Sequence, residues 1–262
     1  ATRVNSQGLI EDMQILSGNL VSNGDFSQEG PELITNGDFA TDSDWTLTQA
    51  TISGGYLNIS TTDGSFSGAR QFVFTVGKTY LVSLEISNIV GTVEVDVNSG
   101  SVYGQTFTTN GSKSFYLKAE NTDIEVKRAF GAEQVISATI DNVSVKEVGQ
   151  DWDFVGEAEL TAQGARVYSS TGSYSSVRQS SDVLTIGNKY KITFNVISTN
   201  GTSLANGNSN ITYDTSTTGN KTFYITASEV GLIFKRAAAI TTDVTITNIS
   251  VKEITDDTNL PR

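Results

Sequence analysis

The chain has 262 residues, contains neither cysteine nor histidine, and carries a formal net charge of −12. This composition excludes disulfide bonds, a thiol nucleophile, a histidine general base and a histidine zinc site. The acidic balance argues against nucleic acid or an anionic membrane surface as partners, because their phosphates would be repelled. No apolar run approaches the roughly 18 residues that a membrane-spanning helix needs. We therefore expect no nucleic-acid partner and no membrane partner.

The N-terminal stretch contains a short duplication. The segment LVSNGDFSQEG at residues 20–30 is followed by the similar LITNGDFATDS at residues 33–43. Only the second copy leads into a tryptophan, Trp45, of the kind that opens a domain. We therefore interpret residues 1–32 as an N-terminal linker or stub.

The rest of the chain is a tandem repeat. Two pairs of similar segments show it: residues 110–119 (NGSKSFYLKA) with 218–227 (TGNKTFYITA), and residues 139–148 (TIDNVSVKEV) with 245–254 (TITNISVKEI). Each copy has about 105 residues, a usual size for one β-sandwich, so the repeat predicts two domains. We place these domains at residues 33–149 and 150–254, followed by a polar C-terminal tail at residues 255–262.

Both copies alternate apolar and polar residues with a period of two, the pattern of half-buried β-strands. The clearest runs are residues 80–86, 92–97, 113–119, 123–128 and 139–146, and in the second copy 190–196, 221–227, 231–236 and 243–252. Glycine, asparagine, serine and aspartate gather between these runs as turns, and no segment has the pattern of a long amphipathic helix. The pattern predicts an all-β chain of two tandem β-sandwich domains of the jelly-roll type.

Only carboxylates remain as acid–base groups, and none stands in a catalytic motif. A glycosidase needs two carboxyl groups about 5–10 Å apart across a cleft. The candidates are Glu85, Glu94, Asp96, Glu125 and Glu133, which fall on solvent-facing strand or loop positions. We therefore expect a protein that is not an enzyme.

A set of polar and aromatic residues recurs at matching positions of the two copies. These residues are Phe66, Arg70 and Gln71 in the first copy and Tyr174, Arg178 and Gln179 in the second. Aromatic faces that stack on sugar rings, with amide and guanidinium donors for the hydroxyl groups, are usual elements of a glycan site. We predict these six as ligand-binding residues; the alternative for the aromatic ones is packing at the core or rim. Trp45 and Trp152, at the domain starts, are predicted to close the core instead.

The opening and closing motifs of the first copy resemble those of a known family. The copy begins with NGDF at residues 36–39, continues with Asp44 and Trp45, and ends with IDNVSV at residues 140–145. It resembles the jelly-roll carbohydrate-binding modules of the xylanase-associated type, and the second copy resembles them by way of the first. The two ends of the chain, residues 1–12 (ATRVNSQGLIED) and 255–262 (TDDTNLPR), look like segments of virion structural proteins of tailed bacteriophages. The resemblance implies a phage tail or head appendage protein.

Asp141 shares strand parity with the apolar Val143, so the sequence places its carboxylate toward the core, where it needs a partner. In the resembling modules the equivalent aspartate and oxygens of the NGDF segment hold a structural Ca²⁺, a cation suited to carboxylates and carbonyls. The resemblance thus implies calcium bound by Asp141, Asp38 and the Gly37 carbonyl in the first domain. The second copy has no such NGDF segment and is expected to hold none. The alternative is that Asp141 caps backbone N–H groups of the Asn36 turn without a metal.

Together these features predict a non-catalytic carbohydrate-binding protein of a bacteriophage virion appendage, and hence an extracellular location on the virion. Its two domains would present weak binding faces to a bacterial surface polysaccharide for host attachment, and two copies raise avidity without tight single sites. Other virion proteins, and a second copy of the chain, are further partners that this context allows. The alternatives are a purely structural spacer or decoration protein, and an accessory binding module of a polysaccharide-degrading enzyme.

Overall fold

The computed structural model describes residues 2–4, 10–12, 14–97, 104–131, 135–179, 181–207 and 211–254. All regular secondary structure in these ranges is β-strand, which confirms the predicted all-β fold. The chain forms two compact units: the first domain, residues 29–148, and the second domain, which joins residues 14–28 to residues 149–254. Within the described ranges no helix is long and apolar enough to cross a membrane.

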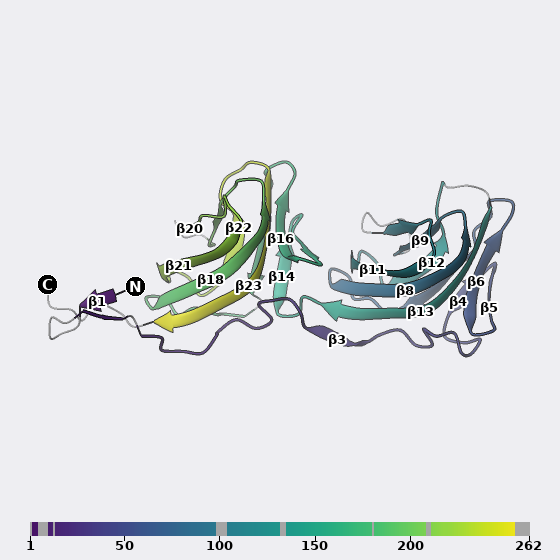
Figure 1. The fold of residues 1–262 in the computed structure, drawn as a ribbon, viewed down its shortest axis with the longest axis horizontal. Helices are drawn as coiled ribbons and strands as arrows, with labels where there is room; N and C mark the ends of the chain where they lie inside the picture. The colour runs from purple at the N-terminus through teal and green to yellow at the C-terminus, as the bar shows by residue number, and fades with distance from the viewer. Residues whose placement is uncertain are drawn as a thin grey trace. The chain divides into compact units, whose positions relative to one another are not determined.

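The first domain is a sandwich of two antiparallel sheets (Figure 1). Its smaller sheet contains, in spatial order, β10 (Gln105–Phe107), β9 (Val93–Asp96), β12 (Asp123–Arg128), β7 (Gly68–Phe72) and β4 (Thr46–Thr48). Its larger sheet contains β11 (Gly111–Lys118), β8 (Thr79–Val90), β13 (Ile136–Val148), β6 (Tyr56–Thr61) and β5 (Ala50–Ser53), with β3 (Glu29–Glu32) added beside β13. Neighbouring strands are often distant in sequence, as the jelly-roll topology requires.

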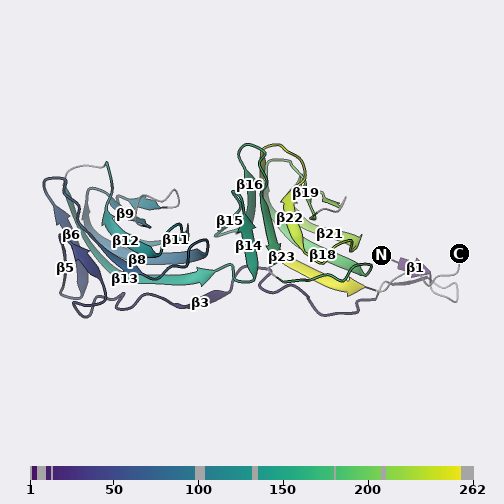
Figure 2. The ribbon, with the colours of Figure 1, turned by 180° about the vertical axis from the view of Figure 1, so that it is seen from behind.

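The second domain repeats both sheets in the same strand order (Figure 2). The smaller sheet contains β20 (Thr212–Tyr213), β19 (Leu204–Ala205), β22 (Ile233–Arg236), β17 (Ser176–Gln179) and β14 (Trp152–Val155). The larger sheet contains β21 (Gly219–Thr226), β18 (Lys189–Thr199), β23 (Thr242–Ile254), β16 (Gly164–Ser169) and β15 (Glu159–Thr161). Separately, β1 (Thr2–Val4) and β2 (Ile10–Asp12) pair with each other.

Equivalent residues occupy equivalent places in the two domains, as the tandem repeat predicts. The matching residues are Tyr80 with Tyr190, and Phe115 opposite Val82 with Phe223 opposite Ile192. Each tyrosine hydroxyl accepts a hydrogen bond from the backbone amide five residues earlier, at 2.8 Å in both domains. The strand register therefore identifies, for a residue of one domain, its equivalent in the other.

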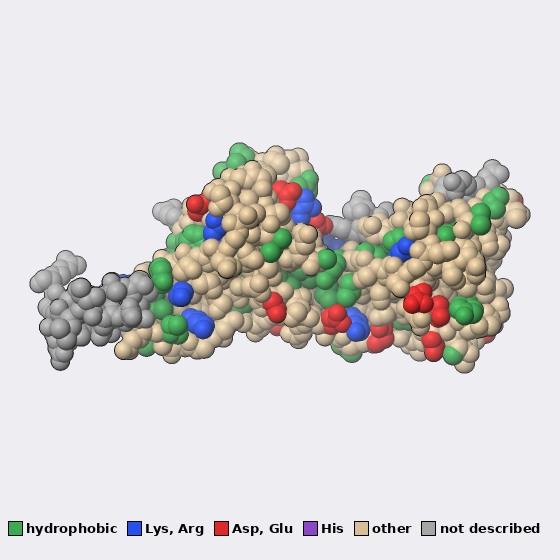
Figure 3. Space-filling view, viewed as in Figure 1, with side chains coloured by type: hydrophobic (Ala, Val, Ile, Leu, Met, Phe, Trp, Pro, Cys, Tyr) green, Lys and Arg blue, Asp and Glu red, His purple; other side chains and the backbone are tan. Residues whose placement is uncertain are grey.

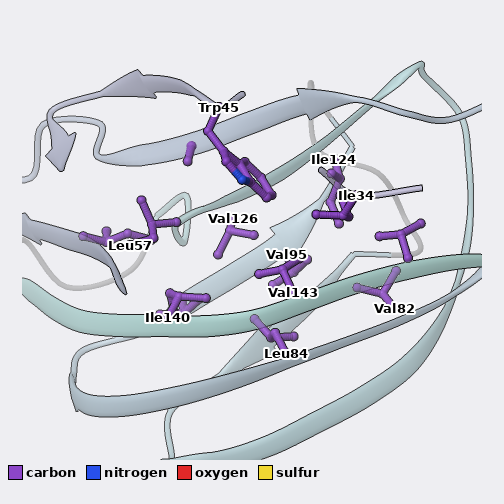
Figure 4. Packing of buried hydrophobic residues seen from close by; sticks show 14 of the residues in the cluster. Ile34, Trp45, Leu57, Val82, Leu84, Val95, Ile124, Val126, Ile140 and Val143 are labelled. Carbon is purple, nitrogen blue, oxygen red and sulfur yellow. The ribbon is translucent and has the colours of Figure 1, made fainter. Parts of the chain in front are cut away.

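The core of the first domain lies between its two sheets (Figure 4). Ile124 and Val126 of β12 and Val82 of β8 are completely buried there. Burial of each such side chain stabilises the fold by about 1.5–3 kcal/mol. Because successive side chains of a strand point to opposite faces, the intervening Glu125 and Lys127 lie on the face of β12 that is turned away from this core.

Residues 14–28 belong to the second domain, so the prediction that they form a linker or stub is wrong. The amide of Leu20 donates to the carbonyl of Val251 at 2.9 Å. The hydroxyl of Ser17 accepts a hydrogen bond at 2.8 Å from the amide of Glu253, 236 residues further on. The first domain is therefore inserted, in sequence, between two parts of the second. A short duplicated motif shows nothing of this, because the strand that it pairs with lies at the other end of the chain.

Each domain is closed by its own NGDF loop. The carbonyl of Gly37 accepts a hydrogen bond from the amide of Val143 at 2.9 Å, and the carbonyl of Gly24 accepts one from Ile249 at 2.8 Å. A Cβ atom on either glycine would overlap the carbonyl oxygen of the same partner residue, so only glycine fits there. The duplication within residues 20–43 thus supplies one loop to each sandwich.

Both tryptophans close the core beside these loops, as predicted. Trp45 is 8% exposed and Trp152 is 5% exposed. Each indole N–H donates to the carbonyl of the loop asparagine, at 3.1 Å in the first domain and 3.0 Å in the second. The ring of Phe39 packs 5.4 Å from that of Trp45, and Phe26 packs 5.2 Å from Trp152, measured between centroids. In each domain the tryptophan therefore holds the loop in two ways: its ring packs against the loop phenylalanine, and its N–H bonds to the loop backbone.

Candidate binding site

The candidate site lies on the face of the smaller sheet of the first domain that points away from the core. The strand register sets out its side chains in two rows across β4, β7, β12 and β9. One row contains Thr46, Arg70, Glu125 and Asp96, and the next contains Thr48, Gly68, Lys127 and Glu94. Directly opposed side chains of this kind have Cβ atoms about 4.5–5.5 Å apart. Four strands thus contribute to one continuous polar face.

A pocket of about 330 Å³ opens on this face. It is lined by Thr46, Thr48, Phe66, Gly68, Ala69, Arg70, Glu125 and Lys127. Gly68 lets β7 and β12 approach closely beside this pocket, because a Cβ atom there would lie only 2.6 Å from the Cβ of Lys127. We call this hollow the Gly68 pocket. Its volume is at the lower end of the roughly 300–1,000 Å³ of small-molecule sites, so it suits one small unit of a ligand.

An ion-paired cluster forms the floor of the Gly68 pocket. The Nζ of Lys127 lies 2.9 Å from Oδ1 of Asp96 and 3.0 Å from Oε2 of Glu125, and all three side chains are buried. Burial, opposed by Lys127 and reinforced by Glu94, raises the pKa of Asp96 to about 6. Burial alone lowers the pKa of Lys127, but its bonds to the two carboxylates outweigh this effect and raise that pKa. The lysine therefore keeps its charge and holds two strands together.

The walls of the pocket carry groups that are free to meet a ligand. The guanidinium of Arg70 lies over the ring of Phe72, 5.5 Å from its centroid, and makes no hydrogen bond or ion pair with any described residue. Phe66 is 42% exposed and Phe72 is 63% exposed. The hydroxyl-bearing Thr46 and Thr48 are also exposed. Hydrogen-bond donors, acceptors and apolar rings are therefore available together on one face.

The structure brings Phe66 and Arg70 together at the Gly68 pocket but places Gln71 elsewhere. Gln71 is 8% exposed and faces the other side of β7. Its Oε1 accepts from the amide of Thr35 at 2.9 Å, and its Nε2 donates to the carbonyl of Thr35 at 3.0 Å and to that of Asp44 at 3.2 Å. Gln179, 6% exposed, likewise donates to a backbone carbonyl, 2.6 Å away. Both glutamines thus hold the entry segments of their domains, and neither side chain is exposed for contact with a ligand.

The matching face of the second domain has a different lining. Register places Asp153, Val155, Ser176 and Ile233 where the first domain has Thr46, Thr48, Gly68 and Glu125. The buried Ser176 takes the register position that Gly68 has in the first domain. Arg178 forms an ion pair with Asp153 at 3.1 Å, and Tyr174 is 49% exposed. Tyr174 and Arg178 therefore occupy equivalent positions without an equivalent surrounding.

The predicted inward orientation of Asp141 is wrong. A β-bulge at Asn142, whose φ is 50°, shifts the register of β13 between Asp141 and Ser144. Ile140 and Val143 are consequently both buried, and Asp141 is partly exposed on the opposite face. Its Oδ1 accepts a hydrogen bond from the amide of Asn142 at 2.7 Å. A bulge changes side-chain parity by one residue, which strict alternation cannot anticipate.

The other two residues of the predicted calcium site are also engaged by the protein. Asp38 is exposed, and its Oδ1 accepts from the amide of Ala40 at 3.3 Å, while the Gly37 carbonyl accepts from Val143. The described residues contain no group of three or more acidic side chains placed to hold a metal ion. Calcium at Asp141, Asp38 and the Gly37 carbonyl, which the motif resemblance implies, stays a prediction. The expectation that the second domain lacks an NGDF segment is wrong, since residues 23–26 supply one.

The strand pattern alone missed most of the pocket. Thr46, Thr48 and Gly68 matter only because β4, β7 and β12 are adjacent, and adjacency is not visible in one sequence. A usable signal existed in β12, where Glu125 and Lys127 alternate with apolar residues. The sequence pattern predicts that Asp96 and Glu125 face solvent, whereas the structure buries both against Lys127. Glu133 lies outside the described residues.

Comparison with known proteins gives only distant likenesses. No family model matches the sequence, and no curated protein matches it. A solved structure described as "CBM4 structure and function" is similar with a TM-score of 0.30 and 14% identity, over 48% of this chain and 98% of the other. The N-terminal CBM22-1–CBM22-2 tandem domain of Xyn10C from Paenibacillus barcinonensis is similar with a TM-score of 0.22 and 11% identity, over 87% of this chain and 98% of the other. Both are carbohydrate-binding modules by name, but likenesses at this level bear on neither ligand nor site.

Proposed function

We propose that the chain is a non-catalytic glycan-binding protein whose site is the Gly68 pocket. The observation that carries this proposal is the unpaired guanidinium of Arg70 at the wall of a hollow on an otherwise regular sheet. Sugar hydroxyls both donate and accept hydrogen bonds, and the pocket answers both needs through Thr46, Thr48, Arg70 and the carboxylate at its floor. The exposed ring of Phe66 adds the apolar surface on which a sugar ring packs.

The arrangement of the carboxylates supports binding rather than hydrolysis. Asp96 and Glu125 come from adjacent strands and bond to the same lysine. A glycosidase instead keeps two carboxyl groups on either side of the bond that it cleaves. Here both groups lie on one side, at and beneath the floor of the pocket, and neither faces an opposing carboxylate across it.

The residues of the second domain at the equivalent place favour a structural role for that domain. Its buried Ser176 takes the register position of Gly68, and its Arg178 is already neutralised by Asp153. We therefore assign glycan binding to the first domain and treat the second as a scaffold, so the proposal is one site per chain and not two equal faces acting through avidity. The chain would then reach high avidity only through several copies on one particle.

The biological setting that we propose is a bacteriophage virion appendage that attaches to a bacterial surface polysaccharide. The motif resemblance at the two ends of the chain supports this setting, although residues 255–262 lie outside the described part. The acidic balance of the chain fits it as well. On the face shown in Figure 3, lysine and arginine side chains are scattered and do not gather into one broad patch. In this setting the protein is extracellular and its other contacts are virion proteins.

Affinity electrophoresis tests the proposal directly. The full chain is run through native gels that contain single bacterial polysaccharides, neutral and acidic, and its retardation is compared with that in a blank gel. We expect retardation by at least one polysaccharide, and its loss in Phe66→Ala. The matched control Tyr174→Ala removes the equivalent exposed ring of the second domain and should bind as the wild type does. A wild-type chain that no polysaccharide retards would favour the purely structural alternative.

A further inference from the structure

Arg70 differs from Arg128, Arg166, Arg178 and Arg236, the other arginines whose side chains the structure describes. The others have partners: Arg128 donates to the carbonyl of Ser65, Arg166 to Asp243 and Glu159, Arg178 to Asp153, and Arg236 to the carbonyl of Ser173. Arg70 makes none of these contacts with a described residue, although it is half-buried at the pocket wall. The guanidinium lies over the ring of Phe72 but has no hydrogen-bond acceptor among the described residues, so the position suits a ligand that supplies one.

The second domain shows which partner this position accepts. Arg178 has the register position of Arg70, and the residue opposite it on the first strand of the sheet is Asp153 in place of Thr46. The Nε of Arg178 lies 3.1 Å from Oδ2 of Asp153. A carboxylate supplied by the chain therefore satisfies the arginine of the second domain. The first domain leaves the same place to a short hydroxyl side chain.

Glu125 does not take over this role, although it lies opposite Arg70 on the other side. Its Oε2 is 3.0 Å from Lys127, and no ion pair joins it to Arg70 within the described contacts. The carboxylates at and beneath the floor of the pocket thus form ion pairs with Lys127, and neither forms a described ion pair with the guanidinium of Arg70. A planar guanidinium binds a carboxylate through two parallel hydrogen bonds, which is the strongest neutralisation available to it.

We infer that the Gly68 pocket selects a glycan unit that carries a carboxylate, of the uronic acid class, and that Arg70 binds this carboxylate. The inference rests on the proposed function and narrows its ligand. Thr46 and Thr48 serve the ring hydroxyls beside the carboxylate, and Phe66 contacts the ring. Because the chain carries a net charge of −12 and repulsion extends about 8–10 Å at moderate salt, widely spaced carboxylates fit better than a dense polyanion.

Polysaccharides that differ only at the carboxylate provide the test. Each acidic polysaccharide from the electrophoresis is used in its native form and after chemical reduction of the carboxyl groups to hydroxymethyl groups. We expect the reduced form to retard the full chain about tenfold less strongly, as the loss of a charge-assisted bidentate contact predicts. Equal retardation by the two forms would overturn the inference and leave glycan binding standing. Retardation by neither form, nor by any neutral polysaccharide, would overturn both.

Two substitutions then assign the effect to Arg70. Thr46→Asp installs the counterion of the second domain at an exposed position, and Arg70→Gln removes the guanidinium. Both should abolish the preference for the native over the reduced polysaccharide, with melting temperatures that show intact folding. The matched control Arg178→Gln should keep the preference. A preference that survives in Thr46→Asp and Arg70→Gln alike would place carboxylate recognition elsewhere and overturn the assignment.

Discussion

The carbonyl oxygen of Gly24 accepts a hydrogen bond from the amide of Ile249 at 2.8 Å, so the first and last parts of the described chain meet in one sandwich. The inserted first domain does not keep these two parts apart. Its ends lie side by side, since Glu29 of β3 is opposite Val148 of β13. An inserted domain whose termini are adjacent leaves its host nearly undisturbed. The N-terminal segment can therefore reach β23 without strain in either domain.

Phe26→Ala should destabilise the second domain and spare the first. The ring is 6% exposed and packs against Trp152, and removing a buried aromatic side chain of this kind costs about 3–5 kcal/mol. Hydrogen exchange with mass spectrometry measures the two domains separately. Amides of β23 should lose protection by about the same free energy, whereas amides of β13 should keep theirs.

The matched control for this prediction is Phe39→Ala, which removes the equivalent ring from the first domain. It should reverse the pattern, with β13 losing protection and β23 keeping it. If Phe26→Ala left β23 unchanged, or lowered the protection of β13 as strongly as that of β23, residues 14–28 would not be part of the second domain as described.

Gln71→Ala should destabilise the first domain without changing glycan binding. Its amide makes partly buried hydrogen bonds to the backbone of Thr35 and Asp44, and losing hydrogen bonds of this kind costs on the order of 1 kcal/mol each. Urea unfolding gives the stability, and affinity electrophoresis gives the binding. A variant with native stability and no retardation would return Gln71 to the ligand site.

The sandwich fold was predictable, and its chain order was not. The alternation of apolar and polar residues around Tyr80 and Val82 predicts a strand with one buried face. The repeat predicts two domains of the same fold. Which strand completes which domain depends on contacts such as Gly24 with Ile249, and a single sequence holds no record of them. The bulge at Asn142 was not predicted, because asparagine tolerates a positive φ but does not require one.

The site was predictable only where the two copies agree. Phe66 and Arg70 stood out because Tyr174 and Arg178 match them. The features that distinguish the first domain are the ones in which the copies differ, above all Gly68 and the residue opposite Arg70. One glycine is a weak signal in a sequence rich in glycine. Its place in the lining of a pocket is visible only once the neighbouring strands are known.

Chelation of divalent cations should leave the melting of both domains unchanged. Asp38, Asp141 and the Gly37 carbonyl all accept hydrogen bonds from the protein, and the fold is complete with these bonds. A bound cation would raise stability by RT ln(1 + [L]/Kd). Calorimetry of the full chain with EDTA and with added Ca²⁺, after its metal content is measured, checks this. A transition that Ca²⁺ raises, and that Asp38→Asn makes insensitive, would establish the calcium site that the motif resemblance implies.

The contribution of Asp96 to the stability of the first domain should fall as the pH rises from about 4 to about 6. Burial raises the pKa of Asp96 from 3.8 to about 6 in the folded chain, so the folded state binds the proton more tightly than the unfolded state does. The contribution is fully present below pH 3.8 and is lost as the pH passes through about 6. Its size is on the order of 1–3 kcal/mol, since each pKa unit corresponds to about 1.4 kcal/mol. The charged groups that face Asp96 are Lys127, Glu125 and Glu94.

Asp96→Asn isolates this effect from other titrating groups, some of which act in the opposite direction. The pKa of Glu32, for example, is lowered by its hydrogen bonds to Ser144 and neighbouring amides, against the effect of burial, so its contribution is lost as the pH falls. Urea unfolding at pH 4.5 and pH 7.5, followed by the fluorescence of Trp45 in a Trp152→Phe background, compares Asp96→Asn with the parent. The substitution also changes the contact with Lys127, whose dependence on the charge of Asp96 is already contained in the pKa of that group. The informative quantity is therefore the change with pH in the stability difference between the two proteins. The variant should gain on its parent by about 1–3 kcal/mol on going to the higher pH. A difference that stays constant between the two pH values would mean that Asp96 titrates normally and that its burial beneath the pocket is wrong.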